Sequence, residues 1–549
     1  MKTHLTFPLS MNHLCAVAIL VTTSAALAAT RFDEFTAKFK TPPNPVKVIS
    51  AGFLGGAGTE WLVGGGFQPD GTVIAAGLAL GPKLDLGVRE VVLGKDAAIT
   101  APAPIPKLDK KGNPEVDKEG KPKMEALGWK HPNATAFVAR LSGDLKTIKS
   151  VTRFGWLGGG LTGAVVDAAG NIYLCGPATD ATAGLSADSQ ELPVAAPDAA
   201  PRGTQHTYLA RLTPDATKVV WVRHFKGSSD APSIALDATG RVLFKGPDYR
   251  VFDAAGKLVS AQAIPGGVGG FVAVNPVDGT WARGGEHHSP TGREPWRCPT
   301  LNIHRPNGEL LYQLYDWGGP FVGLNNLRLV SDTAIRGVAY DAQGNLLLHA
   351  WSDGGNSVAV REPMDIRASA KMGSIGFSAW GAGVLSCAYV IKIDPKTCKV
   401  IGGTPWLAYQ QEVNKPNSAR IHTLASAVDG SVCIAGGSSM GLIQTGNAIG
   451  SVPGGEFVAV LNEDCSSIRF CTAMPACADV LLDDSSTDKA RWGIVSGKVN
   501  GKPVALFLGS AVELNTHYDQ NPAPAVNARQ AKFGGGLADG YLLLLDLSK

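Results

Sequence analysis

The densest group of side chains that could do chemistry lies near the middle of the chain. It comprises Glu286, His287 and His288, followed closely by Arg293, Glu294, Trp296 and Arg297. A histidine or a glutamate can act as an acid or a base in a polar cleft. Two adjacent histidines cannot share one face of a helix or strand, so together they make a poor metal site unless the loop curls. We therefore interpret the run either as a ligand-binding or acid–base loop or as a solvated loop.

A second set of candidates stands where strands are predicted to begin: Glu60, Trp61, Arg336, Arg420, His422, Arg491 and Trp492. The three arginines occupy comparable positions, so they could converge on a carboxylate or sulfate group of a ligand. The two tryptophans could stack on a sugar ring, as aromatic side chains do in wet pockets. The alternative is structural, with arginines that bind loop carbonyls and tryptophans that pack between sheets.

The motifs of several enzyme classes are missing from the sequence. We find no H-E-x-x-H and no G-x-x-x-x-G-K-[ST]. Glycine runs such as 158–160 precede predicted strands and not helices, so they are not phosphate-binding loops. We expect no cofactor and no metal, and the residues leave open whether the chain is catalytic.

The elements that would position these candidates form a repeat. In VVDAAGNIYLCG (165–176), hydrophobic residues alternate on both sides of an Asp-Gly turn, which is typical of a β-hairpin. The pattern recurs at 233–246, 337–350 and 425–437. A further strand pattern, AFVARLSGD at 136–144, recurs at 207–215, 388–396, 456–464 and 540–548, and another strand follows it. One unit therefore has four strands, which we name a, b, c and d.

Seven such units are marked by the glycines of their a–b turns: Gly71, Gly170, Gly240, Gly279, Gly344, Gly430 and Gly501. Small four-stranded sheets must stack on one another to bury both faces, and radial stacking makes a β-propeller. We predict an all-β, seven-bladed propeller of antiparallel blades in a single domain, 29–549. The predicted blades are 57–156, 157–227, 228–265, 266–324, 325–410, 411–477 and 478–549 plus 44–56. The turn aspartates are interpreted as turn formers and not as calcium ligands.

The two ends of the chain predict how the ring closes. The last unit stops after its strand c, whereas KVISAGFLGG (47–56) resembles a strand d without the three strands before it. We expect the N-terminal strand to pair into the last blade, which would leave no open sheet edge there.

The order GN-[IV]-Y-x-x-G, a Thr/Ser-rich gap, [DE]-[AG]-[FY]-V-x-[KR]-L and a strand ending in LGG resembles the bacterial SBBP-type β-propeller repeat. Residues 170–176, 207–212, 456–461 and 52–56 carry this resemblance. It implies a secreted or surface propeller of bacterial type and brings no catalytic residues. The short third unit and the charged excursion at 80–134 depart from the family pattern, which leaves individual blade limits open.

The lengths of the connections differ between the two faces of the predicted propeller. The b–c and d–a connections share one face, the long-loop face, and include 80–134, 177–205, 286–299, 351–386, 437–454 and 509–538. The a–b and c–d turns share the other, the turn face, and are short. Long loops on one rim of a rigid scaffold commonly carry binding sites, so we expect the site on the long-loop face. Within the first excursion, 104–125 is interpreted as a solvated hairpin.

The N-terminal segment and the overall composition indicate where the protein acts. Residues 1–28 read as a signal peptide, with an apolar stretch at 14–27 and the small-x-small pattern Ala26-Leu27-Ala28, so we expect a secreted or periplasmic protein. A net charge of +3 gives no indication of nucleic acid, and no later stretch predicts a membrane span. Eight cysteines remain after the signal, which permits up to four disulfides or buried thiols.

These observations lead to one functional expectation and one alternative. We expect a monomeric, exported binding or scaffold protein whose long-loop face engages a glycan or a protein. The alternative is a secreted lyase or hydrolase acting on polysaccharides at the central channel of the same face. An enzyme should bring together a titratable pair, such as His422 with Glu60 or Glu286.

Overall fold

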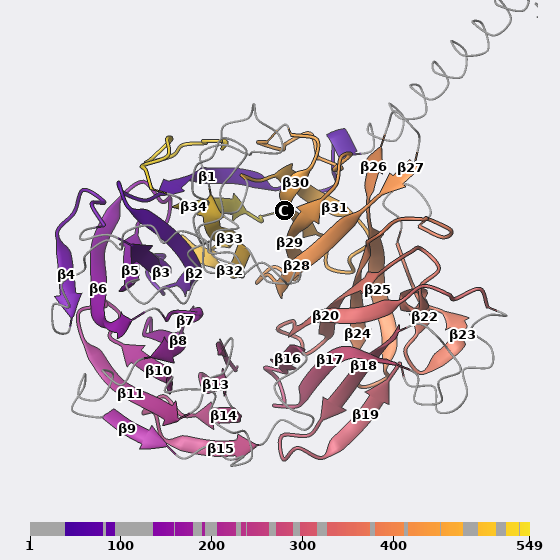
Figure 1. Cartoon of the computed structure of the whole chain (residues 1–549), viewed down its shortest axis with the longest axis horizontal. Coiled ribbons are helices and arrows are strands. Elements are labelled where there is room, and N and C mark those ends of the chain that lie inside the picture. The colour runs from indigo at the N-terminus through magenta and orange to yellow at the C-terminus, as the bar shows by residue number, and fades with distance from the viewer. Residues whose placement is uncertain are drawn as a thin grey trace, which may run out of the picture.

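The computed structural model describes residues 39–80, 84–93, 135–158, 160–178, 189–192, 206–226, 232–237, 239–246, 248–262, 271–288, 297–315, 327–373, 379–410, 415–450, 452–475, 492–511, 523–536 and 538–548. Within these residues, seven mainly antiparallel sheets are arranged radially around a common axis (Figure 1). The predicted all-β, seven-bladed propeller is therefore confirmed.

In each blade, four strands follow one another from the axis outward. The first three blades are β2 (Thr59–Phe67), β3 (Val73–Leu80), β5 (Thr135–Leu141) and β6 (Ile148–Gly158); β7 (Gly163–Val166), β8 (Ile172–Ala178), β10 (His206–Leu212) and β11 (Val219–Lys226); and β12 (Ser233–Leu236), β13 (Val242–Lys245), β14 (Tyr249–Phe252) and β15 (Leu258–Gln262). The fourth and fifth are β16 (Phe271–Val274), β17 (Trp281–His288), β18 (Arg297–His304) and β19 (Leu310–Leu314); and β20 (Thr333–Tyr340), β21 (Leu346–Ser352), β24 (Cys387–Asp394) and β25 (Lys399–Trp406). The sixth and seventh are β28 (Ala419–Ser426), β29 (Val432–Ser438), β30 (Gly455–Leu461) and β31 (Ile468–Ala473); and β32 (Trp492–Val499), β33 (Lys502–Ala511), β34 (Asp539–Asp546) and β1 (Lys47–Leu54).

The last blade confirms the predicted closure of the ring. Strand β1 pairs antiparallel with β34, from Lys47 opposite Asp546 to Leu54 opposite Gly540. The first strand thus becomes the outer strand of the blade that contains the end of the chain (Figure 1). Because β34 then has a partner on each side, its edge is protected from pairing with other chains.

Two blades carry a fifth strand that the repeat did not predict. Strand β4 (Glu90–Leu93) pairs parallel to β6, and β9 (Ser189–Leu192) pairs parallel to β11. Two small hairpins lie outside the blades, β22 (Arg361–Glu362) with β23 (Asp365–Ser369) and β26 (Ala408–Gln410) with β27 (Lys415–Asn417), and a 3-10 turn spans Val358–Val360. The hairpin predicted at 104–125 lies outside the described residues.

The turn aspartates have the structural role predicted for them. In the second blade, Asp167 Oδ1 accepts hydrogen bonds from the backbone N–H groups of Ala169 and Asn171, both at 2.9 Å. Gly170 has a φ of 85°, a conformation that glycine adopts without steric cost. Asp341 in the fifth blade accepts the equivalent bonds at 2.9 and 2.8 Å. These contacts make the a–b turn a self-contained local structure.

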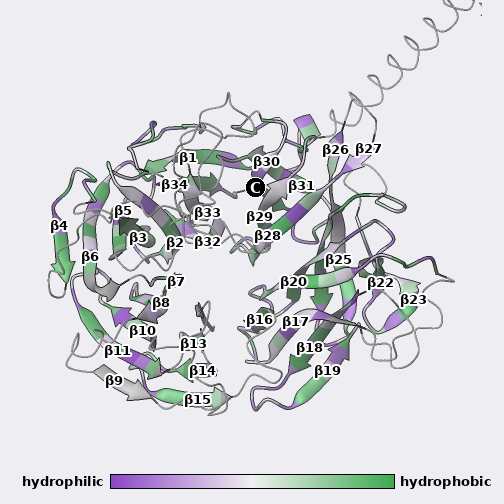
Figure 2. Ribbon diagram, viewed as in Figure 1, coloured by the Kyte–Doolittle hydropathy of each residue, from purple (hydrophilic) through white to green (hydrophobic). Residues whose placement is uncertain are grey.

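Hydrophobic side chains from adjacent blades fill the space between the sheets. Figure 2 shows hydrophobic residues concentrated on the strands of the blades. The seven cysteines in the described residues are buried free thiols: Cys175, Cys298, Cys387, Cys398, Cys433, Cys465 and Cys471. Burial raises the pKa of Cys175 to about 12, so its thiol stays protonated and packs as a small apolar side chain.

Candidate functional site

Two predicted residues meet on the axis side of the fourth and fifth blades. Glu286 of β17 accepts an ion-paired hydrogen bond from Arg336 of β20, with 3.1 Å between Oε2 and Nη2. Glu286 also lies 3.5 Å from the guanidinium of Arg297, which pairs in turn with Asp332. The Arg336 guanidinium stands 5.8 Å from the ring centroid of Trp351. Since Arg336 is already neutralised by Glu286, it does not offer an uncompensated positive charge to an anion.

Two of the predicted residues sit at β-bulges. Strand β20 bulges between Ile335 and Gly337, so Arg336 is the extra residue, and β28 bulges between Ile421 and Thr423, so His422 is the extra residue. A bulge re-aims a side chain relative to a regular strand. A β-bulge in the inner strand thus sets the direction of both Arg336 and His422, which lie in neighbouring blades.

A histidine that the sequence analysis did not single out lies beside them. Burial, together with the nearby charges of His422 and Arg336, lowers the pKa of His349 in β21 to about 3. His349 is therefore neutral near pH 7 and is not a proton donor there. Its ring fills the space beside Gly337, where an added Cβ would lie 2.2 Å from Nε2.

The remaining predicted residues are placed as follows. Trp61 and Trp492 are 2% and 1% exposed, so their indoles pack in the core and are not available to stack on a sugar in this structure. Arg420 lies half-buried in β28, opposite Gly437 of β29. Residues 287 and 288 end strand β17, paired with 298 and 297. Residue 491 lies outside the described residues, so the convergence of three arginines stays a prediction.

Glu60 lies beside another carboxylate, whereas His422 was the partner that we considered for it. It is fully buried at the start of β2, where it lies beside Asp539 of β34. Burial raises the pKa of Glu60 to about 8, opposed by a hydrogen bond from Gly56 and by the charge of Arg153 and reinforced by the charge of Asp539. Burial likewise raises the pKa of Asp539 to about 6. This pair has shifted pKa values, but no substrate can reach it while both side chains are buried.

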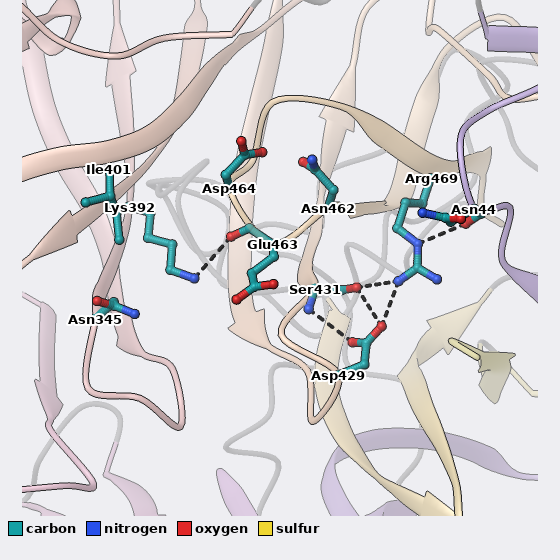
Figure 3. Close-up of a pocket in the computed structure, with 10 residues that line it drawn as sticks. All are labelled: Asn44, Asn345, Lys392, Ile401, Asp429, Ser431, Asn462, Glu463, Asp464 and Arg469. Carbon is teal, nitrogen blue, oxygen red and sulfur yellow. Dashed lines mark hydrogen bonds and ion pairs between the residues drawn. The ribbon is translucent and has the colours of Figure 1, made fainter. Parts of the chain in front are cut away.

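A polar pocket lies on the turn face, opposite the face that we expected to hold the site. Its volume is about 450 Å³. It is formed by turns and strand ends of the fifth and sixth blades and by the segment before β1, and Figure 3 shows these residues around it. The lining residues are Asn44, Asn345, Lys392, Ile401, Asp429, Ser431, Asn462, Glu463, Asp464 and Arg469.

The two cations of this pocket are neutralised by the protein itself. Arg469 is 2% exposed and pairs with Asp429 at 2.7 Å, and it also donates to the carbonyls of Asn44 and Leu547 at 2.9 and 2.8 Å. Lys392 is 3% exposed and pairs with Asp341 at 2.9 Å. A buried ion pair needs such complete bonding to offset the desolvation of its charges. These cations therefore shape the pocket but carry no spare charge.

The groups that remain to face a ligand are amides and carboxylates. Asn345, Asn462 and Asp464 are half-buried, and Glu463 is exposed at the c–d turn between β30 and β31. Burial works to raise the pKa of Asp464, but hydrogen bonds from Ser466 and Asn462 and the charge of Lys371 outweigh it, so the pKa is lowered. Asp464 is consequently ionised near pH 7 and accepts hydrogen bonds. The amides are partly used within the protein: Asn345 donates to Asp341 at 2.8 Å, and Asn462 donates to Ser466 at 3.1 Å and accepts from Ser467 at 3.0 Å. The pocket thus offers carboxylate acceptors, and amides with part of their hydrogen-bonding capacity left, to a ligand.

The sequence did contain a signal for this pocket that we did not use. Lys392 and Arg469 are charged residues inside strand patterns that are otherwise apolar. A cation in such a position must be buried with a partner or exposed at a site. The partners, Asp341 and Asp429, come from the a–b turns of the same two units, and the sequence analysis treated these turns as structural.

Comparisons with known proteins extend no further than general likeness. No family model matches the chain, and no curated protein matches it in sequence. Among solved structures, it is similar to the Dos1 propeller, at a TM-score of 0.35 and 8% identity over 94% of this chain and 96% of that one. It is similar to a protein of unknown function from Dyadobacter fermentans, at 0.35 and 10% identity over 91% and 99%. A third, the Kuenenia stuttgartiensis hydrazine synthase, gives 0.33 and 11% over 62% and 75%.

Two features are absent from the described residues. In those ranges, no helix is long and apolar enough to cross a membrane. Within the same part of the chain, no three or more His, Cys, Asp or Glu side chains gather as a metal-binding group.

Proposed function

We propose that this protein is an exported β-propeller that binds a saccharide in the polar pocket of the turn face. The observation that carries the proposal is the internal neutralisation of Lys392 and Arg469. Because Asp341 and Asp429 already pair with these cations, the pocket is not an anion site. The amides and carboxylates that remain are suited to a ligand rich in hydroxyl donors.

The size and polarity of the pocket support a small polar ligand. A volume of about 450 Å³ lies within the usual range of small-molecule sites, about 300–1,000 Å³. A carboxylate can bind two neighbouring hydroxyl groups of a sugar ring, and the Asn462 amide can add further bonds to those that it makes with Ser466 and Ser467. Glu463 and Asp464 also leave the pocket with negative charge, which favours a neutral or an amino sugar over an acidic one.

Binding is better supported than catalysis. Retaining and inverting glycosidases both need two carboxyl groups that reach the substrate, one of them with a raised pKa. The pair with raised pKa values, Glu60 and Asp539, is fully buried on the far side of the molecule from this pocket. At the pocket itself, the pKa of Asp464 is lowered, which suits an acceptor and not a general acid.

A second candidate is the site that the sequence analysis expected on the long-loop face. The chain of contacts from Arg297 through Glu286 to Arg336 lies on that side and is partly exposed, with 23% of the Arg336 side chain open to solvent. Polar groups of a glycan or protein partner could replace one of these ion pairs and bind to Glu286 or to either arginine.

The test is a glycan array probed with the labelled protein, followed by Kd measurements with the saccharide that it selects. We expect Glu463→Gln to weaken binding about 10–100-fold, because it removes a hydrogen bond to a charged group, and Asn462→Ala to weaken it about 2–10-fold. Glu309→Gln changes an exposed glutamate in the c–d turn of the fourth blade and should leave Kd unchanged. Loss of binding in Arg336→Ala with none in Glu463→Gln would favour the second candidate, and an array without any bound saccharide would contradict both saccharide sites.

A further inference from the structure

The seam where the ring closes contains two glycine-rich segments that pack on each other. After β1, residues 55–58 cross from the outer strand of the seventh blade to the inner strand of the first. Residues 534–536, just before β34, lie against this crossing. An added Cβ at Gly534 would lie 2.3 Å from the Gly56 carbonyl, and one at Gly536 would lie 1.9 Å from the Gly58 carbonyl. The two backbones approach so closely that only glycine fits.

Two carboxylates converge on this crossing from opposite ends of the chain. A Cβ at Gly55 would lie 2.4 Å from Oδ1 of Asp539 and 2.9 Å from Oε2 of Glu60, so both groups reach the same point in space. Glu60 and Asp539 are each 0% exposed. Both therefore sit in a closed space that is bounded largely by backbone.

In each carboxylate, only one of the two oxygens accepts a hydrogen bond from the protein. Glu60 Oε2 accepts from the Gly56 N–H at 3.1 Å, and Asp539 Oδ2 accepts from the Gly534 N–H at 2.6 Å and from Gln530 at 3.2 Å. The other oxygens, Glu60 Oε1 and Asp539 Oδ1, are buried and have no hydrogen-bond partner among the described residues. Buried polar atoms are rarely left in this state, so the two oxygens indicate a missing partner.

The charges around the pair do not supply that partner. Arg153 lowers the pKa of Glu60, but its guanidinium bonds Thr135 at 2.6 Å and lies 3.5 Å from Glu90. The mutual repulsion and burial of the two carboxylates disfavour their ionisation, and a bound cation would reverse that effect.

We propose that Glu60 and Asp539 bind a hard divalent cation, Ca²⁺ by its chemistry, and that this ion fastens the closure between the first and seventh blades. Ca²⁺ takes about 6–8 oxygen ligands from carboxylates, backbone carbonyls and water, so the two carboxylates would supply part of the shell and carbonyls and water the rest. The Gly56 carbonyl lies beside Gly534, whose backbone N–H donates to Asp539 Oδ2, so a backbone oxygen stands close to the carboxylates. The site lies on the long-loop face and is separate from the turn-face pocket.

The test compares the full-length protein in EDTA and in about 10 mM CaCl2, above the Kd of about 0.1–1 mM typical of extracellular calcium sites. We expect Ca²⁺ to raise Tm of the wild type by about 2–4 °C. We also expect Tb³⁺ to give luminescence sensitised through Trp61, the residue next to Glu60, and Ca²⁺ to displace it.

Isosteric variants separate this site from general ion effects. Glu60→Gln and Asp539→Asn should each lose the Tm response and the Tb³⁺ signal. Glu456→Gln, at the start of strand c in the sixth blade, should keep both. An absent Ca²⁺ response in the wild type would overturn the proposal, as would a response that survives in Glu60→Gln and Asp539→Asn. If one variant does not fold, the other variant and the wild-type titration still decide the result.

Discussion

Phe53 is the side chain through which the N-terminal strand enters the core of the last blade, and its removal tests the closure of the ring. It is 7% exposed, and its ring meets Phe533 and Tyr541 edge-on at 5.9 and 5.5 Å. Truncating a buried phenylalanine to alanine costs about 3–5 kcal/mol. Phe533 is only partly buried and can relax into the space. We therefore expect Phe53→Ala to lower the free energy of unfolding by about 3 kcal/mol.

The assay is urea denaturation of Phe53→Ala followed by tryptophan fluorescence, with Val259→Ala as the matched control. Val259 lies on β15, the outer strand of the third blade, and is 52% exposed. Its truncation should change the free energy of unfolding by less than about 0.5 kcal/mol. If Phe53→Ala is no more destabilising than Val259→Ala, strand β1 does not close the ring in the way described.

Three further predictions concern the pocket, the seam and the bulge. Arg469→Met leaves the buried Asp429 without its cation and should destabilise the protein by about 3–5 kcal/mol in chemical denaturation, and adding Asp429→Asn should recover part of that loss. In EDTA, the wild type should lose stability as pH rises from about 5 to 8, because Glu60 has its ordinary pKa of about 4.5 in the unfolded chain and a pKa of about 8 in the folded protein. The Tm of Glu60→Gln should change less over that range. Gly337→Ala should lower the free energy of unfolding by about 1–3 kcal/mol, since the new methyl group would collide with the buried His349 ring, and an unchanged Tm would contradict the packing described there.

The architecture was predictable because its information is local and repeated. The Asp-Gly turn at Asp167 and Gly170 sets the hairpin geometry within a few residues, and the alternating pattern assigns each strand face. The closure was predictable because residues 47–56 resemble a lone strand d, whereas the last unit lacks its strand d. The extra strands β4 and β9 were not, because each pairs in parallel with a strand that follows it in the sequence beyond another strand of the blade.

The candidate site was harder to predict from the sequence, because it depends on which side chains meet across blades. A tryptophan at the start of a strand has the same local pattern whether it faces the axis or a neighbouring sheet, and Trp61 and Trp492 face the core. Glu60 meets Asp539 from the other end of the chain, a contact that no spacing indicates. The pocket arises where Arg469 meets Asp429 and the segment before β1, so its shape exists only in the closed ring.

The most direct test of the central claim, that the turn-face pocket is the ligand site, is hydrogen–deuterium exchange with and without the array-selected saccharide. The account predicts that the saccharide slows exchange at 429–431 and 462–469, the turns and strand that line the pocket. Slowed exchange confined to 286–299 and 329–336, with no change at the two turns, would contradict it.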